Sequence, residues 1–428
     1  METEMFEDLI SQGISLMSCE NYAAAKECFE KAAHINPKSK DLYKHLGNAN
    51  ANLGMYDEAL EAFQKILILS ANDGETFFSM GNVYVLQNKK LKAIEYYNKA
   101  EESGYATSQM YQIMASIFFE VDDVAQALRN ISRAIHLAPF DGTLRLFKAR
   151  IYLAYNRYDE ALETLDEMEK ILPDAYEAYD MKAQIFCGLT RYEEALEISK
   201  KARERFPEDS NIATMRLKVL VAAEKNQEAR LLLAEMKNKG MYEAVIKDAV
   251  IQESILDIKE QQIDRAYEAL LQANNILAAD SDILYLILDL CGKTGMYEKV
   301  LAHSEELMKI ECSDFYQATA MYFHANALEE TGQKEKAKEE YKSLTSKLRK
   351  FTINNPSFYE GYLYRLLSHA KIGEYEQALK LTDYVENLYP DRADAHAFRY
   401  FIYKEMGNEE LADKEKGLAS KLNPNLMM

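Results

Sequence analysis

One short stretch of the 428-residue sequence has the residue types of a phosphate-binding loop. Residues 291–294 read CGKT, and in such a loop backbone amides and a lysine hold the phosphates of a nucleotide. The full motif requires a second glycine five residues before Gly292, and Ile287 stands at that position. We therefore interpret residues 291–294 as a turn between two helices, and we predict that the chain uses no nucleotide or other cofactor.

The histidines and carboxylates form no recognisable metal-binding or catalytic pattern either. The seven histidines show no HExxH motif and no cysteine at ligand spacing, so we predict no metal site. General acid–base catalysis requires two facing groups in different environments. The carboxylate pairs instead recur at the beginning of predicted helices, where negative charge is favourable; Asp57-Glu58 and Glu193-Glu194 are examples. No nucleophile has a base as its partner, so the sequence predicts no catalytic residues and no enzyme.

These acidic pairs belong to a sequence unit that is repeated along the chain. Residues 156–173 read NRYDEALETLDEMEKILP, and residues 190–207, thirty-four positions later, read TRYEEALEISKKARERFP. Residues four and seven positions after the alanine of this unit share its helix face, and most of them are apolar. A period near 34 predicts an array of helical repeats. The alanine column with its constant spacing of 34 is Ala25, Ala59, Ala93, Ala127, Ala161, Ala195 and Ala229.

The chain resembles the tetratricopeptide repeat family, whose helix-turn-helix unit has the pattern W-x2-L-G-x2-Y, then A-x3-F, then P. The third repeat carries this pattern in Gly81, Tyr84, Ala93, Tyr97 and Ala100. The resemblance covers about residues 6–424 and about twelve repeats. It implies an all-α fold, a tetratricopeptide-repeat α-solenoid in which antiparallel helix pairs form a right-handed superhelix. The sequence has no tryptophan, and the positions where the family often has one hold Tyr43, Phe77, Tyr179 and Tyr362.

The repeats divide the chain into a regular and a less regular part. Residues 1–240 keep the 34-residue register and contain repeats 1–7, whereas residues 241–428 contain repeats 8–12 with slips of three, three and seven positions. We expect one long helix over 241–262, an extended helix before the breaker at 354–356, and a C-terminal capping helix over 409–422. Residues expected at the left-handed turns between the paired helices are Glu20, Asn21, Gly54, Asn88, Asp122, Asn156 and Thr190.

Composition excludes several classes of partner. The formal net charge of −19 argues against nucleic acid, which requires clustered lysine and arginine, and against an anionic membrane surface. The N-terminal METEMFEDLISQG has no apolar run, so we expect no signal peptide, and no stretch approaches the roughly 18 apolar residues of a membrane span. Five cysteines at scattered positions indicate a reducing compartment. We expect a cytoplasmic protein.

Function is expected on the inner surface of the array. The resemblance implies that the first helix of each repeat lines a concave groove, and residues spaced by three and four positions on such a helix share one face. Asparagines there can bind a peptide backbone, and apolar side chains can hold its side chains. The alternative is a solvated or self-packed face. The candidate peptide-binding residues are Lys44, Asn48, Phe78, Asn82, Val85, Phe119, Leu146, Arg150 and Leu153.

A known variant of such a groove is expected only in part. Some family members clamp the terminal carboxylate of a chaperone tail with lysine, asparagine and arginine from three repeats. Lys44 and Asn48 match the first pair, whereas Ser79, Gln109 and Ile113 do not match the later positions.

The functional hypothesis is a non-enzymatic protein–protein interaction scaffold that binds a peptide or helical segment in its groove. Two alternatives remain open: a regulatory sensor that binds a short peptide and changes its curvature, and an accessory subunit of an enzyme encoded elsewhere. Its partner is expected to be a protein or peptide.

Substitution of Lys293 tests the turn interpretation of residues 291–294. We expect Lys293→Ala to change neither ATP binding nor the midpoint of a denaturant melt, because a turn lysine holds no phosphate. Isothermal titration of both proteins with ATP checks this expectation. ATP binding by the wild-type protein that disappears in the variant would overturn the interpretation.

Overall fold

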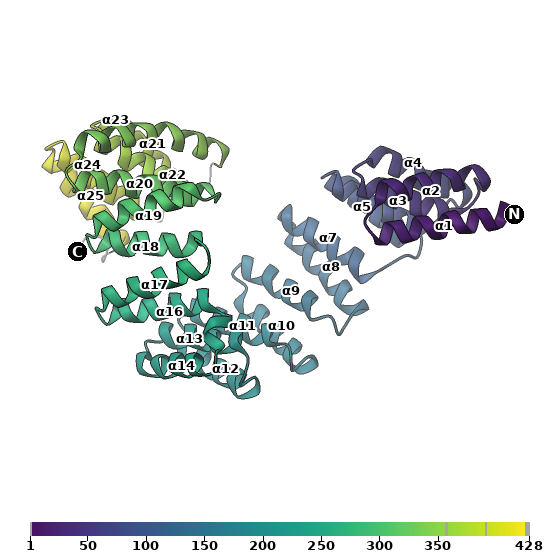
Figure 1. Cartoon of the computed structure of the whole chain (residues 1–428), viewed down its shortest axis with the longest axis horizontal. Helices are drawn as coiled ribbons and strands as arrows, with labels where there is room; N and C mark the ends of the chain where they lie inside the picture. Colours follow the sequence, from purple (N-terminus) through teal and green to yellow (C-terminus); the bar gives the residue numbers. More distant parts are fainter. Residues whose placement is uncertain (1, 356–357, 390–391, 424–428) are drawn as a thin grey trace. The chain divides into compact units, whose positions relative to one another are not determined.

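The computed structural model describes residues 2–355, 358–389 and 392–423, and these residues form helices and turns with no strand (Figure 1). Twenty-five helices occur in these ranges. They are α1 Glu2–Ser18, α2 Tyr22–Ile35, α3 Lys40–Asn52, α4 Tyr56–Leu69, α5 Gly74–Leu86, α6 Lys90–Glu102, α7 Ser108–Glu120, α8 Val124–Leu137, α9 Gly142–Ala154, α10 Tyr158–Ile171, α11 Tyr176–Gly188, α12 Tyr192–Arg205, α13 Ser210–Ala222, α14 Asn226–Asn238, α15 Met241–Ala244, α16 Ile246–Lys259, α17 Ile263–Ile276, α18 Ser281–Lys293, α19 Tyr297–Lys309, α20 Asp314–Glu330, α21 Lys334–Asn354, α22 Tyr359–Lys371, α23 Tyr375–Leu388, α24 Asp394–Glu405 and α25 Glu409–Leu422.

All of these helices except α15 form consecutive pairs, each closed by a residue with positive φ. At the first turn Glu20 has φ 58, and the N–H of Asn21 donates to the carbonyl of Leu16 over 2.9 Å, which closes the first helix. Six of the seven residues expected at the left-handed turns are confirmed, whereas Asn21 has φ −86 and caps α2. The turns continue through the less regular part. Left-handed residues between paired helices are Glu20, Gly54, Asn88, Asp122, Asn156, Thr190, Glu224, Gln261, Gly295, Gly332, Gly373 and Gly407.

The alanine column lies where paired helices touch. Ala161 and the other six alanines of the column have no exposed surface. A second column of small residues on the first helices permits the same close approach: a Cβ added to Gly47 would lie 2.6 Å from the ring of Phe63, and one added to Gly81 would lie 2.5 Å from the ring of Tyr97. The core of each repeat is therefore fixed by contacts between small residues and large rings.

Residues 1–202 and 203–428 form two compact units, called here the first and second compact unit. The first has clusters of buried side chains around Phe29 and Phe63 and around Tyr97 and Ile131. The second has its largest cluster around Leu270, between α16 and α20. The expected division of the repeats at residue 240 concerns their regularity and stays a prediction.

The register slip after Gly240 has a local cause. Gly240 has φ 67, and the short helix α15 follows it. Val245, with φ −133 and ψ 34, then separates α15 from α16. The single long helix expected over 241–262 is therefore wrong, because Val245 leaves the helical region. The extended helix before residue 355 is confirmed as α21, with 21 residues. Pro356, Pro390 and Pro424, expected to end helices, lie outside the described residues.

Enlarging a column alanine tests this packing. Ala161→Leu inserts a branched side chain where no surface is exposed, so we expect it to lower the free energy of unfolding by about 1–3 kcal/mol. Urea unfolding followed by circular dichroism checks the value. Ala154→Leu, the same change at an exposed position on α9, is the matched control and should stay within about 0.5 kcal/mol of the wild type. A neutral Ala161→Leu would contradict the assigned register.

Candidate functional site

The predicted peptide-binding residues all lie on first helices of the first compact unit. The nine side chains are distributed over four of these helices. We call them the inner stripe. Its members are Lys44 and Asn48 on α3, Phe78, Asn82 and Val85 on α5, Phe119 on α7, and Leu146, Arg150 and Leu153 on α9.

Two polar members of the inner stripe are engaged within the protein. Lys44 forms an ion pair with Glu75 at the beginning of α5, which joins two neighbouring repeats. Asn82 accepts a hydrogen bond of 2.7 Å from the hydroxyl of Tyr97 on α6. To bind a peptide backbone through its side-chain oxygen, Asn82 must therefore share that oxygen with Tyr97 or lose the hydrogen bond to it. Lys44 is already paired with Glu75 and so is not a free cation for a terminal carboxylate.

The aromatic members are half-buried, because they pack on neighbouring rings. The Phe78 ring centroid lies 5.8 Å from that of Tyr97 and 5.6 Å from that of Tyr105. Phe119 meets Phe147 edge to face, with centroids 6.2 Å apart. These contacts hold the rings in fixed positions and leave part of each accessible.

Arg150 is the exposed end of the inner stripe. Its side chain makes no hydrogen bond or ion pair with any described residue, and it lies on α9 between Leu146 and Leu153, which are half-buried in the cluster around Ala149. An uncompensated cation beside apolar side chains suits a partner with an acidic group next to an apolar one.

A second polar feature was missed by the sequence reasoning. One position of the first helix can carry a residue that meets the second helix of the preceding repeat, as Lys182 meets Glu169 over 2.6 Å. It lies thirteen positions before the column alanine in repeats two to seven, and thirteen positions before residues 266, 300, 337, 378 and 412 in the later repeats. We call this the charge column. An alignment of the 34-residue repeats contains this column. It does not stand out there, because its residues are apolar in the early repeats and include both positive and negative charges in the later ones. Its members are Leu46, Met80, Met114, Lys148, Lys182, Arg216, Glu253, Ile287, His324, Arg365 and Arg399.

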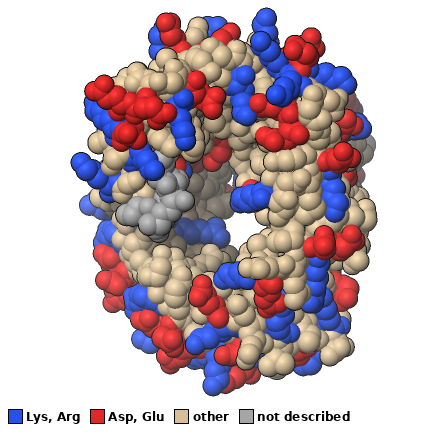
Figure 2. Space-filling model, turned by 90° about the vertical axis from the view of Figure 1, so that its left-hand side faces the viewer, with Lys and Arg blue, Asp and Glu red and all other residues tan. Residues whose placement is uncertain are grey.

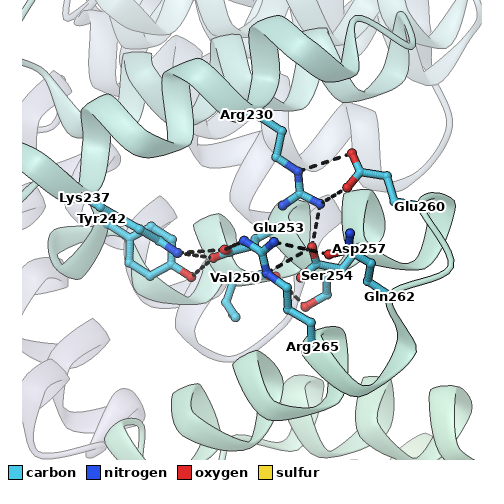
Figure 3. Close-up of polar contacts among 10 residues, drawn as sticks. All are labelled: Arg230, Lys237, Tyr242, Val250, Glu253, Ser254, Asp257, Glu260, Gln262 and Arg265. Atoms are coloured by element: carbon cyan, nitrogen blue, oxygen red, sulfur yellow. Dashed lines mark hydrogen bonds and ion pairs between the residues drawn. The ribbon is translucent and has the colours of Figure 1, made fainter.

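Glu253 is the acidic member of the column and lies in a network of polar contacts (Figure 3). The residue is 4% exposed, and its carboxylate accepts hydrogen bonds from Lys237 of α14 over 2.7 and 2.8 Å and from the Tyr242 hydroxyl of α15 over 2.7 Å. Arg265 of α17 approaches it to 3.7 Å. One buried carboxylate therefore joins four helices at the place where the register slips.

A second carboxylate lies one turn further along α16. Asp257 is fully buried, and Arg230 of α14 lies 2.5 Å from it and 2.7 Å from Glu260 (Figure 3). Glu253 and Asp257 thus anchor α16 to α14 by two separate ion pairs. Removing one partner of a buried pair is destabilising, since it leaves a charge without compensation.

The electrostatics of this network do not suit acid–base chemistry. Burial alone would raise the pKa of Glu253, but hydrogen bonds from Lys237 and Tyr242 and the charge of Arg265 outweigh it and hold the pKa below its ordinary value. A general acid or base needs a pKa near the operating pH. A cavity of about 480 Å³ adjoins Glu253, Arg265 and Tyr242. The Glu253 carboxylate, however, is already bound by Lys237 and Tyr242.

Other chemistries have little support within the described ranges. Lys293 ends α18 and pairs with Asp289 over 2.7 Å, so residues 291–294 form a helix end and not a phosphate loop. The described residues contain no cluster of three potential metal ligands, and no described helix has the length and apolarity to cross a membrane. Acidic and basic side chains are interspersed over the face drawn in Figure 2.

Comparison with known proteins identifies the repeats. Three family profiles, each described as tetratricopeptide repeat, match residues 10–74, 118–185, and 74–103 with 318–346. The chain is a tetratricopeptide repeat protein. This agrees with the paired helices and their left-handed turns.

Relatives of this tetratricopeptide repeat protein are distant. Anaphase-promoting complex subunit 3 of Schizosaccharomyces pombe is 22% identical over 153 residues, which is 36% of this chain and 23% of that protein. The BBSome complex member BBS4 of Bos taurus is 23% identical over 148 residues, 35% of this chain and 28% of that protein. The match thus spans less than a third of either relative. Among solved structures, yeast Tom70 has a TM-score of 0.46 and 13% identity, with 97% of this chain and 96% of that chain covered.

The Glu253 network should appear in the pH dependence of stability. Because the pKa of Glu253 is lower in the folded than in the unfolded protein, its contribution is present above about pH 4.3 and is lost as the pH falls through the folded value. We expect Glu253→Gln to lower the free energy of unfolding by about 1–3 kcal/mol at pH 7. Urea unfolding of both proteins as a function of pH should show this gap narrowing below about pH 4.3.

Glu243→Gln is the matched control, since Glu243 is exposed on α15 beside the same cavity. A gap that is independent of pH, or an equal effect in Glu243→Gln, would contradict the role given to the Glu253 ion pairs.

Proposed function

We propose that this tetratricopeptide repeat protein is a non-enzymatic scaffold that binds an apolar segment of a partner protein on its inner stripe. The single observation that carries the proposal is the pair of half-buried rings, Phe78 on α5 and Phe119 on α7, to which α9 adds the exposed and unpaired Arg150. Two curated relatives bear the names of subunits of multiprotein complexes, which supports a role in assembly.

The rings would supply most of the binding energy. Each is held by aromatic neighbours, so a partner that covers it loses little side-chain entropy of the protein. Buried aromatic anchors typically contribute on the order of 2 kcal/mol or more each to binding. An amphipathic helix or an extended segment can present apolar residues at the required spacing.

Polar recognition would come from Arg150 and not from a terminal-carboxylate clamp. Lys44, one of the two residues that match the clamp, is paired with Glu75, and the neighbouring Asn82 is bound by Tyr97. Arg150 has no such contact, and its planar guanidinium pairs well with an aspartate or glutamate. We infer a partner segment whose apolar residues are followed by an acidic one.

Removing the two rings tests the proposal. A random peptide library displayed on phage is selected against the wild-type protein, and the selected peptides are titrated against purified proteins. We expect Phe78→Ser combined with Phe119→Ser to weaken the affinity at least tenfold while the helical circular dichroism at 25 °C remains, because two anchors are lost. The melting temperature is measured alongside, since both rings also pack internally.

A charge reversal separates binding from stability. Arg150→Glu should weaken the binding of the same peptides, whereas Lys170→Glu, the same reversal of charge at an exposed position on α10, should not. Undiminished binding by a folded double variant, or equal losses in the two charge variants, would place the binding site elsewhere on the chain.

A further inference from the structure

A cavity of about 390 Å³ in the second compact unit has a cationic lining. It lies between α21, α22 and α23, and none of the described residues that line it is acidic, although the chain has 70 acidic and 51 basic residues. Arg365, His369 and Lys380 line it together with the rings of Tyr362 and Tyr384, whose centroids are 4.8 Å apart. The cavity is separate from the inner stripe, which belongs to the first compact unit.

Arg365 has no partner among the described residues. It forms no hydrogen bond or ion pair there, and its Nε is buried without an acceptor, whereas its two terminal nitrogens are not among the buried unpartnered atoms and so reach open space. Burial, followed by the charge of Arg349, lowers the pKa of Arg365, with no carboxylate acting against it. A guanidinium stays protonated in proteins, so its charge is uncompensated.

Arg399, the same residue type in the same column one repeat later, shows how such a guanidinium is normally held. Its Nε donates to Thr382 Oγ1 over 2.9 Å, and Nη2 donates to Asp383 over 2.7 Å and to Glu386. These partners stand seventeen, sixteen and thirteen positions earlier, on the preceding second helix. Lys182 follows the same rule, since Asp166 lies 2.5 Å from it, sixteen positions earlier.

Every one of these partners is replaced around Arg365. The positions seventeen, sixteen and thirteen residues earlier hold Leu348, Arg349 and Thr352, so an aliphatic side chain, a cation and a hydroxyl stand where Arg399 has its acceptors. The structure agrees with this alignment, because Thr352 lines the cavity and the Arg349 charge acts on Arg365.

The remaining charges near the cavity do not compensate Arg365. Glu374 is bound by His369 Nδ1 over 2.7 Å, and Lys380 is an exposed cation without a partner among the described residues. Lys148, another column member without an ion pair, lies 5.8 Å from the ring centroid of Tyr152 and has no buried unpartnered nitrogen. Arg365 is therefore the described column member that combines an uncompensated charge with a buried unpartnered donor.

We propose that this cavity binds a small anion with carboxylate or phosphate oxygens, which supplies the counter-charge that α21 lacks. The terminal nitrogens of Arg365 would bind two of its oxygens, as a planar guanidinium does with either group. Lys380 adds a second positive charge, and Tyr362 and Tyr384 form an apolar wall for the rest of the ligand. This site is independent of the peptide-binding proposal.

Isothermal titration of the full chain with inorganic phosphate and with glutarate, each against chloride at equal ionic strength, tests the proposal and distinguishes the two sources. We expect saturable binding of at least one anion at one site. Arg365→Gln should weaken it at least tenfold and should not lower the melting temperature measured without the anion, because it removes an uncompensated charge. No binding of either anion, or unchanged binding by Arg365→Gln, would overturn the proposal.

Restoring the missing carboxylate provides a second, independent arm. Arg349→Asp places at that position the residue type that holds Arg399, so we expect it to raise the melting temperature and to abolish anion binding. Lys350→Asp is the matched control, with the same change of net charge at the neighbouring exposed position. Equal losses of anion binding in both variants would show a non-specific surface effect and would also overturn the proposal.

Discussion

Contact between a small residue on the first helix of a repeat and a ring on the second sets the spacing on which the other features depend. At Gly13, Gly47 and Gly81 a Cβ would lie within 2.6 Å of a ring atom of Phe29, Phe63 or Tyr97. This leaves no room for polar groups at the closest approach of a helix pair. Polar side chains therefore meet away from that point, either across the pair, as Asn82 and Tyr97 do, or between repeats, as Lys44 meets Glu75 and Lys182 meets Glu169.

The fold was predictable because the same sequence pattern recurs in each repeat. Glu20 and Thr190 are poor choices for a left-handed turn when taken singly, yet both have positive φ, because the helices on either side determine where the turn falls. The buried alanine column follows in the same way, since seven alanines at one spacing outweigh any local preference. At the slip after Gly240 the prediction failed, because nothing in the residues that follow indicated that Val245 would end one helix and begin another. At the later slip the extended helix was predicted correctly.

The candidate site was less predictable, because side chains find partners that spacing along one helix does not reveal. Lys44 and Glu75 are 31 residues apart and meet only because neighbouring first helices lie side by side. Asn82 has a partner on the second helix of its own repeat, since Tyr97 extends its hydroxyl across the pair. The positions of the inner stripe on α3 to α9 could be derived from periodicity, whereas which of them are free for a partner required the structure.

The charge column changes character along the chain, and this has a consequence for the order of the repeats. Leu46, Met80 and Met114 would fit against many apolar neighbours, whereas Lys182 fits a preceding helix that carries Glu169, and Glu253 fits one that carries Lys237. A buried ion pair adds little stability over an apolar contact, but a mismatched one is strongly unfavourable. If the two preceding helices were exchanged, Lys182 would face Lys237 and the two positive charges would repel each other. The charged members of the column therefore favour one order of the repeats, whereas the apolar members do not. Arg365 departs from this pattern, because it has no partner among the described residues of the preceding helix and so contributes nothing to the order of the repeats, while its buried Nε keeps the cost of an unmade hydrogen bond.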